Sequence, residues 1–219
     1  MPNDSGRGYA VEPGGMVVSD PLRAQGYRTQ RAESPEDLWQ PLYDRMNFAA
    51  VGSASLSFFS IARGQSTTLI RAGATGAFSK TFRDTNMENS NVVPTKLFKF
   101  VGISLAFVHE DEGEAQNPAD RDKIRSGGYF HFRIVDKDIL YLPLVFIPEV
   151  NPFVVNTTTA SLGAAGGGGA NVAMYKLPIP ITLNPYENFN VEIVWDGTVV
   201  ITKAVDIYVA LQGFMRRPT

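Results

Sequence analysis

The chain has no cysteine and only two histidines, His109 and His131, among its 219 residues. The absence of cysteine excludes disulfides, thiolate nucleophiles and zinc-thiolate sites. Two imidazoles are fewer than a cupin-type metal centre normally uses, and no Gly-x-Ser-x-Gly sequence marks a nucleophilic serine. No spacing singles out a pair of carboxylates for glycoside hydrolysis. We therefore expect no enzymatic activity and no cofactor, and we assign no catalytic residue.

The chain also lacks an excess of charge of one sign, since 20 Lys and Arg stand against 22 Asp and Glu. This balance gives no general attraction to nucleic acid or to an anionic membrane. No stretch approaches the roughly 18–20 apolar residues of a membrane span, and the N-terminal region has no apolar segment typical of a signal peptide. We expect no signal peptide, no transmembrane anchor and no direct nucleic-acid binding.

Alternation of apolar and polar residues with a period of two fills most of residues 56–214. Such alternation is typical of half-buried β-strands. No helix of ten or more residues is predicted between the strands, which excludes a βαβ repeat and favours antiparallel sheets. The predicted strands are 56–62, 66–72, 77–83, 97–109, 128–135, 139–147, 174–183, 189–195, 198–203 and 205–214. This number of strands predicts a sandwich of two sheets.

Asp196-Gly197 is the clearest turn signal in the chain. It lies between two apolar alternating segments, and Asp-Gly is favoured in two-residue hairpin turns. The sequence predicts a hairpin there, with its second strand over 198–203.

Three segments lie outside the predicted strands: an N-terminal arm, a short helical segment and a Gly-rich loop. Residues 1–33 have too few apolar residues to form a core and are predicted to be an extended arm. Ser34 and Pro35 resemble the start of a helix, so a short helical segment is expected over 34–46, interrupted at Pro41. The remaining chain, 34–219, is predicted to be one domain with a flexible Gly-rich loop at 156–173.

Two polar segments carry oxygen ligands of the kind that calcium prefers. Asp84 and Asn86 alternate in one of them, and Glu110, Asp111 and Glu112 follow a long predicted strand in the other. Neither spacing is that of an EF-hand. We favour an Asx-turn for the first segment and a solvated acidic loop for the second, and we assign no metal site.

The order of several segments resembles a known family over roughly residues 50–218. The chain is similar to the single jelly-roll capsid proteins of tailless icosahedral bacteriophages, in which the jelly rolls stand upright on the shell. The segments that carry the resemblance are Arg83-Asp84-Thr85-Asn86-Met87, Pro94 before Phe98-Lys99-Phe100-Val101-Gly102-Ile103, Tyr129-Phe130-His131-Phe132-Arg133-Ile134 with Tyr141-Leu142-Pro143-Leu144, and Val209-Ala210-Leu211-Gln212-Gly213-Phe214 before Arg216-Arg217-Pro218.

This resemblance implies an all-β fold: an antiparallel two-sheet jelly-roll β-sandwich with an extended N-terminal arm and one short helical segment. The implied function is that of a virion structural protein that self-assembles into an icosahedral capsid shell after synthesis in the host cytoplasm. Its partners would be copies of itself and other virion proteins. The basic and acidic residues of the arm balance, whereas the arms with which some capsid proteins bind the genome are basic. This balance suits a shell whose inner surface meets a lipid layer or another protein.

A carbohydrate-binding jelly-roll module, either receptor-binding or lectin-like, is the alternative. Its stacking residues would be aromatic, because aromatic rings combine a large apolar face with a polar edge. Aromatic residues exposed together on one face would favour this alternative. The candidates are Trp39, Tyr129, Tyr141, Tyr186 and Trp195.

Overall fold

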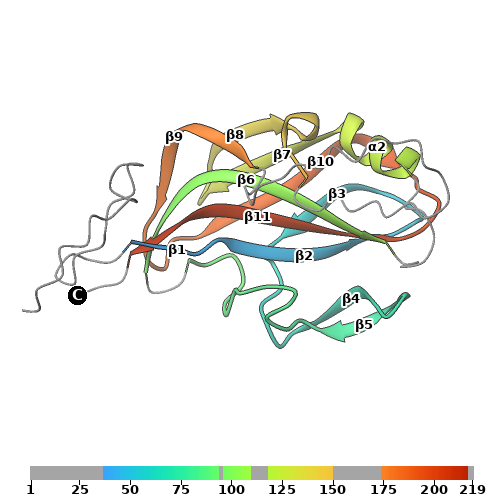
Figure 1. The fold of residues 1–219 in the computed structure, drawn as a ribbon, viewed down its shortest axis with the longest axis horizontal. Coiled ribbons are helices and arrows are strands. Elements are labelled where there is room, and N and C mark those ends of the chain that lie inside the picture. The colour runs from blue at the N-terminus through green and yellow to red at the C-terminus, as the bar shows by residue number, and fades with distance from the viewer. Residues whose placement is uncertain (1–36, 94–95, 110–117, 150–173, 217–219) are drawn as a thin grey trace, which may run out of the picture. The chain divides into compact units, whose positions relative to one another are not determined.

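The computed structural model describes residues 37–93, 96–109, 118–149 and 174–216. These residues form two antiparallel sheets and a separate β-hairpin (Figure 1). The predicted arm 1–33 and the predicted Gly-rich loop 156–173 lie outside the described residues.

The first sheet has the strand order β2 (Leu42–Phe48), β11 (Val205–Arg216), β6 (Leu97–His109) and β9 (Tyr175–Leu183), with the short β1 (Asp37–Trp39) also paired to β11. The second sheet has the order β3 (Ser53–Phe58), β10 (Phe189–Val199), β7 (Gly128–Ile134) and β8 (Lys137–Pro143). The hairpin consists of β4 (Ser66–Arg71) and β5 (Ala74–Ser79).

The strand pairing is nested around the β7–β8 connection. β7 pairs with β8, β6 with β9, β3 with β10 and β2 with β11, all antiparallel. One long hairpin of eight strands rolled into two sheets has this pairing, which is the jelly-roll arrangement. The predicted fold class is confirmed.

The core lies between the two sheets. In β11 the inward residues Val205, Ile207 and Val209 are fully buried. Aromatic side chains from opposite sheets meet there: the ring centroids of Phe100 and Phe132 are 5.4 Å apart, and those of Phe48 and Trp195 are 4.9 Å apart. Such pairs contribute about 0.5–1.5 kcal/mol beyond the burial of their area.

The predicted helical segment at 34–46 is wrong over the residues that the structure describes. Residues 37–39 and 42–48 are β1 and β2, and Pro41 lies between them. Leu42 and Met46, which suggested one face of a helix, are four residues apart and therefore also share one face of a strand. All seven residues of β2 pair with β11, and this pairing decides in favour of the strand.

A short helix does exist, but it lies elsewhere, at α2 (Pro118–Gly127) between β6 and β7. Its sequence is rich in charge, and Ile124 is its buried apolar residue. A helix without an apolar stripe gives no periodic signal, which is why it was not predicted. The indole N–H of Trp195 donates to the Ile124 carbonyl at 2.8 Å and ties the helix to β10. No described helix combines the length and the apolar content that a membrane crossing requires.

The hairpin predicted at Asp196-Gly197 is also wrong. β10 continues through these residues to Val199, and its pairing with β3 shifts in register between Val194 and Val199. The signal therefore marks an irregularity within one strand, and the predicted strand 198–203 is absent from the described structure. A two-residue hairpin turn is found at Ala72-Gly73, where both residues have positive φ, 49° and 74°, as a type I′ turn requires.

Candidate functional site

The outer face of the first sheet carries buried charge beneath the β4–β5 hairpin. Arg45 of β2 is 1% exposed, and its Nε lies 2.6 Å from Asp206 Oδ2 of β11. Arg45 Nη1 also lies 3.4 Å from Asp84 Oδ1, while Arg71 Nη2 of the hairpin lies 2.5 Å from Asp84 Oδ2. Guanidinium groups suit such sites because their several donors can serve two carboxylates at once.

The same charged residues bind the backbone of the hairpin. Arg45 Nη2 donates to the Ile70 carbonyl at 2.6 Å, and the Ile70 N–H donates to Asp206 at 2.8 Å. Asn47 Nδ2 donates to the second oxygen of Asp206 at 2.6 Å. An isolated two-stranded hairpin is at best marginally stable, so these bonds fix where β4 and β5 lie.

Asp44 and Lys80 complete this arrangement on the other side of β2. Lys80 Nζ lies 2.6 Å from Asp44 Oδ1, and both side chains are fully buried. Burial raises the pKa of the Asp44 carboxyl above its ordinary value, although Lys80 and the Phe59 N–H oppose that change. We name the six charges the buried ion network; three cations balance three carboxylates: Arg45, Arg71 and Lys80 with Asp44, Asp84 and Asp206.

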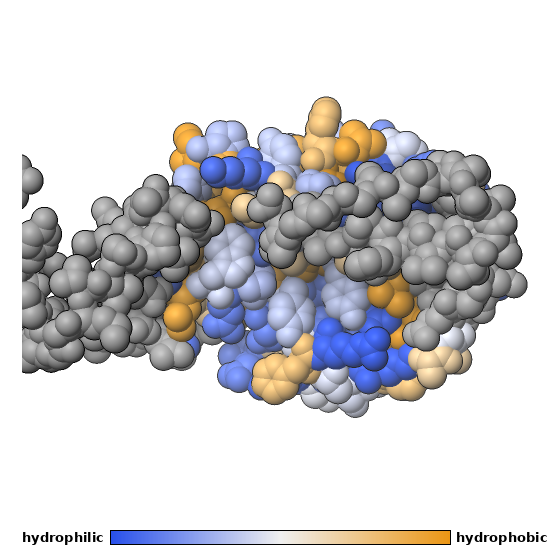
Figure 2. All heavy atoms as spheres, viewed as in Figure 1, coloured by the Kyte–Doolittle hydropathy of each residue, from blue (hydrophilic) through white to orange (hydrophobic). Residues whose placement is uncertain are grey.

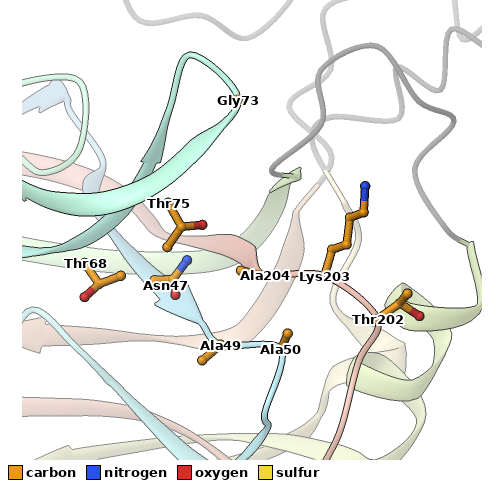
Figure 3. A pocket seen from close by; sticks show the side chains of 9 residues that line it. All are labelled: Asn47, Ala49, Ala50, Thr68, Gly73, Thr75, Thr202, Lys203 and Ala204. Atoms are coloured by element: carbon orange, nitrogen blue, oxygen red, sulfur yellow. The ribbon is translucent and has the colours of Figure 1, made fainter.

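A hollow of about 450 Å³ adjoins this network between the end of β2, the hairpin and the loop before β11 (Figure 3). Small side chains form most of its wall, and Lys203 is the charged residue in it. Lys203 and Thr75 each have an interaction of their own. The lining therefore offers no converging set of charged groups for a ligand. Its residues are Asn47, Ala49, Ala50, Thr68, Gly73, Thr75, Thr202, Lys203 and Ala204.

A second polar surface lies on the outer face of the second sheet, at β7 and β8. His131 and Tyr141 are cross-strand partners, and their rings are stacked with centroids 4.3 Å apart and planes 13° apart. Tyr129 lies beside them, with its ring centroid 6.1 Å from that of Tyr141. Asp138 Oδ1 is 2.7 Å from His131 Nε2. We name these four residues the aromatic cluster.

Hydrogen bonds within the aromatic cluster change the protonation equilibria of two members. The hydrogen bond from His131, followed by that from Tyr141, lowers the pKa of Asp138 below the ordinary value of an aspartate. The reciprocal bond to Asp138 raises the pKa of Tyr141. At neutral pH the cluster therefore holds an ionised carboxylate beside a neutral phenol.

The structure brings together two of the five sugar-stacking candidates, Tyr129 and Tyr141. Trp39 is on β1 in the other sheet, where its ring meets Phe214 edge-on at 4.9 Å, and Tyr186 is exposed on the turn between β9 and β10. Trp195 is corrected as a candidate, because it is only 3% exposed and lies in the core.

Sequence reasoning did not place His131 and Asp138 beside these tyrosines. The turn alone does not give this arrangement, because it pairs Ile134 with Lys137 and Arg133 with Asp138, and that register would place Leu140 opposite His131. The bulge between Phe132 and Arg133 shifts the pairing by one residue and brings Tyr141 opposite His131, and alternation in the sequence does not predict such a bulge.

Two of the five calcium candidates, Asp84 and Asn86, lie among the residues that the structure describes. Asp84 is buried, and both of its carboxylate oxygens face arginine donors, Arg45 and Arg71. Asn86 binds backbone groups of Pro41 and Tyr43. In the part of the chain that the structure describes, no three His, Cys, Asp or Glu residues are grouped as metal ligands. Glu110, Asp111 and Glu112 lie outside that part.

Large apolar side chains are exposed at several margins of the sandwich. Val145 and Phe146, in the 3₁₀ turn η1 (Leu144–Phe146) that follows β8, are 51% and 63% exposed, and Ile179 of β9 is 79% exposed. Val51 and Val200 are exposed at one end of the strands. On the face seen in Figure 2, apolar residues gather in separate groups near the rim, with hydrophilic residues over much of the lower part.

Comparison with known proteins adds no relative to this description. No protein-family model matches the chain, and no curated protein matches it significantly.

Proposed function

We propose that the chain is a virion structural protein whose copies pack into a closed icosahedral shell. The observation that carries the proposal is the set of exposed apolar side chains at separate margins of a jelly roll, among them Phe146 and Ile179. Jelly rolls are common in capsid proteins, although lectin domains share them. A shell subunit meets several neighbours at once and needs apolar contacts on more than one side.

The edge of β9 supports side-chain contacts between copies rather than strand pairing. Pro178 and Pro180 lack the backbone donor that a new strand would need. They stand where the pairing of β9 with β6 changes register, between Ile181 and Lys176. Edges of this kind resist open-ended sheet growth and leave association to side chains such as Ile179.

A subunit of this kind would contact copies of itself and other virion proteins. It would be made in the host cytoplasm and would function in the virion. An inner lipid layer is a further contact that the charge balance of the chain allows.

The test compares assembly of the natural chain with that of two variants, Phe146→Asp and Ile179→Asp. Light scattering at physiological salt and electron microscopy are expected to show large closed particles for the natural chain. Each variant is expected to give smaller species at an unchanged melting temperature, because a buried charge opposes the contact while the exposed position does not affect the fold. Thr198→Asp, an exposed position on β10, is the matched control and should assemble normally.

A natural chain that stays monomeric at every concentration and salt tested would contradict the proposal. It would favour the alternative, a monomeric carbohydrate-binding module. The observation behind that alternative is the position of Tyr129 and Tyr141 on one face, 6.1 Å apart.

A further inference from the structure

Tyr141 presents one face of its ring at the margin of the second sheet. Among the described strands, β8 is the last of this sheet and pairs with β7 alone. His131 stacks on one side of the Tyr141 ring, and no described strand of the sheet lies beyond β8 on the other side. The residue is 56% exposed, so a flat apolar surface of one ring is available to a ligand.

The ring is held in this position before any ligand arrives. Stacking on His131 fixes its plane, and its hydroxyl is hydrogen bonded to Asp138. Asp138 is in turn bound to His131 Nε2. Because the side chain is already ordered, a ligand that stacks on it loses little affinity to side-chain ordering.

Polar groups of both kinds surround the ring. The Asp138 side chain is 49% exposed, and a carboxylate has about four acceptor sites, so its bonds to His131 and Tyr141 leave sites for further donors. Arg133 is the cross-strand partner of Asp138, and its Nη2 lies 3.8 Å from Glu192 Oε2. Asp138 and Arg133, one carboxylate and one cation, therefore lie beside the ring, and their charges balance.

From this arrangement we propose that the aromatic cluster binds a neutral saccharide. A pyranose ring has one face of C–H groups, which fits the Tyr141 ring, and hydroxyls at its rim, which can donate to Asp138 and accept from Arg133. A protein partner would favour a contiguous apolar centre depleted of charge, and charged groups stand directly beside this ring. The site lies within one chain, so it would operate in a shell subunit and in a monomer alike.

The experiment measures binding of lactose, cellobiose and maltose to the full chain by saturation-transfer NMR and calorimetry. At least one sugar is expected to bind with a dissociation constant on the order of 1 mM. Tyr141→Ala should weaken binding by at least roughly tenfold and Asp138→Asn by several fold, while Tyr141→Phe, which keeps the ring, should retain most of it. Phe82→Ala is the matched control: it removes an exposed aromatic ring that belongs neither to the aromatic cluster nor to the sugar-stacking candidates.

Every outcome of the binding experiment either supports or contradicts the proposed saccharide site. Loss of binding in the Tyr141→Ala and Asp138→Asn variants, with the control unchanged, supports it. If Tyr141→Ala does not fold, Asp138→Asn and Tyr141→Phe still carry the comparison. Absence of binding for all three sugars, or equal binding by natural chain and Asp138→Asn, overturns it. Neither result depends on particle formation, so the saccharide-site proposal and the shell proposal can be contradicted independently of each other.

Discussion

At the scale of single residues, Arg45 has the largest share in the buried ion network. Its guanidinium binds Asp206, Asp84, the hydroxyl of Tyr208 and the carbonyl of Ile70. It therefore satisfies partners from three separate parts of the chain while being 1% exposed. A buried charge of this kind adds specificity of position, because its removal leaves Asp206 buried without a cation.

We predict that Arg45→Met lowers the free energy of unfolding by about 3–5 kcal/mol, since Asp206 remains buried without its cation, whereas Asp84 keeps Arg71. Urea denaturation followed by circular dichroism measures the change. Arg216→Met is the control, because Arg216 pairs with Asp37 at the surface and such pairs contribute about 0–1 kcal/mol. Similar losses in both variants would show that the buried network does not stabilise the fold in this way.

At the scale of strands, the two sheets are interrupted by bulges that contain glycine. The pairing of β11 with β6 shifts in register between Gln212 and Gly213, and that of β10 with β3 shifts around Gly197. The surroundings of the two glycines differ. A Cβ atom at Gly213 would lie 2.3 Å from the Lys99 carbonyl oxygen and 2.7 Å from the Phe98 ring, whereas nothing lies within 4 Å of one at Gly197.

This difference predicts opposite effects for one chemical change. Gly213→Ala should destabilise the fold by at least about 1–3 kcal/mol, because the backbone of β6 cannot move away without breaking the ladder. Gly197→Ala should be neutral or stabilise by about 0.4–1 kcal/mol, because alanine reduces the freedom of the unfolded chain. Denaturant midpoints of the two variants test the pair, and a loss of stability at Gly197 as large as at Gly213 would contradict it.

At the scale of the whole molecule, strands from near the two ends of the described chain close the core. β2 and β11 are side by side in the first sheet although more than 150 residues separate Asp44 from Val209. Long-range pairing of this kind must be formed before the burial of the core is complete, and it predicts slow folding for a domain of this size. The described core cluster runs from Leu42 to Met215.

Deletion of residues 1–33 should therefore leave the sandwich folded. We predict a change in melting temperature of less than about 4 °C, which corresponds to less than about 1 kcal/mol for a domain of this length. If the predicted extended arm also ties subunits together, the same deletion should reduce particle yield in light scattering. A truncated chain that fails to fold would show that the arm contributes to the core.

Much of the fold was predictable from local periodicity. The alternation in 97–109 predicted the bounds of β6 as found, and the segments 128–135 and 174–183 differ from β7 and β9 by one residue at one end. These predictions succeeded because side-chain alternation reports directly on burial of one face of a strand. Spacing of four residues at Leu42 and Met46 failed because helices and strands both satisfy it, and Asp196-Gly197 failed because a bulge uses the same residues as a turn.

The sequence by itself thus determined most of the strands, the antiparallel class, and the lack of cysteine and small number of histidines. Only the tertiary structure decided which strands pair, that Asp84 is part of a buried ion network, and that Tyr129 and Tyr141 share a face while Trp195 lies in the core. Alternation assigns a residue to one of two faces, but it does not say which strand lies beside it. That choice depends on contacts between residues far apart in the chain, whose free energy exists only once the two sheets have come together.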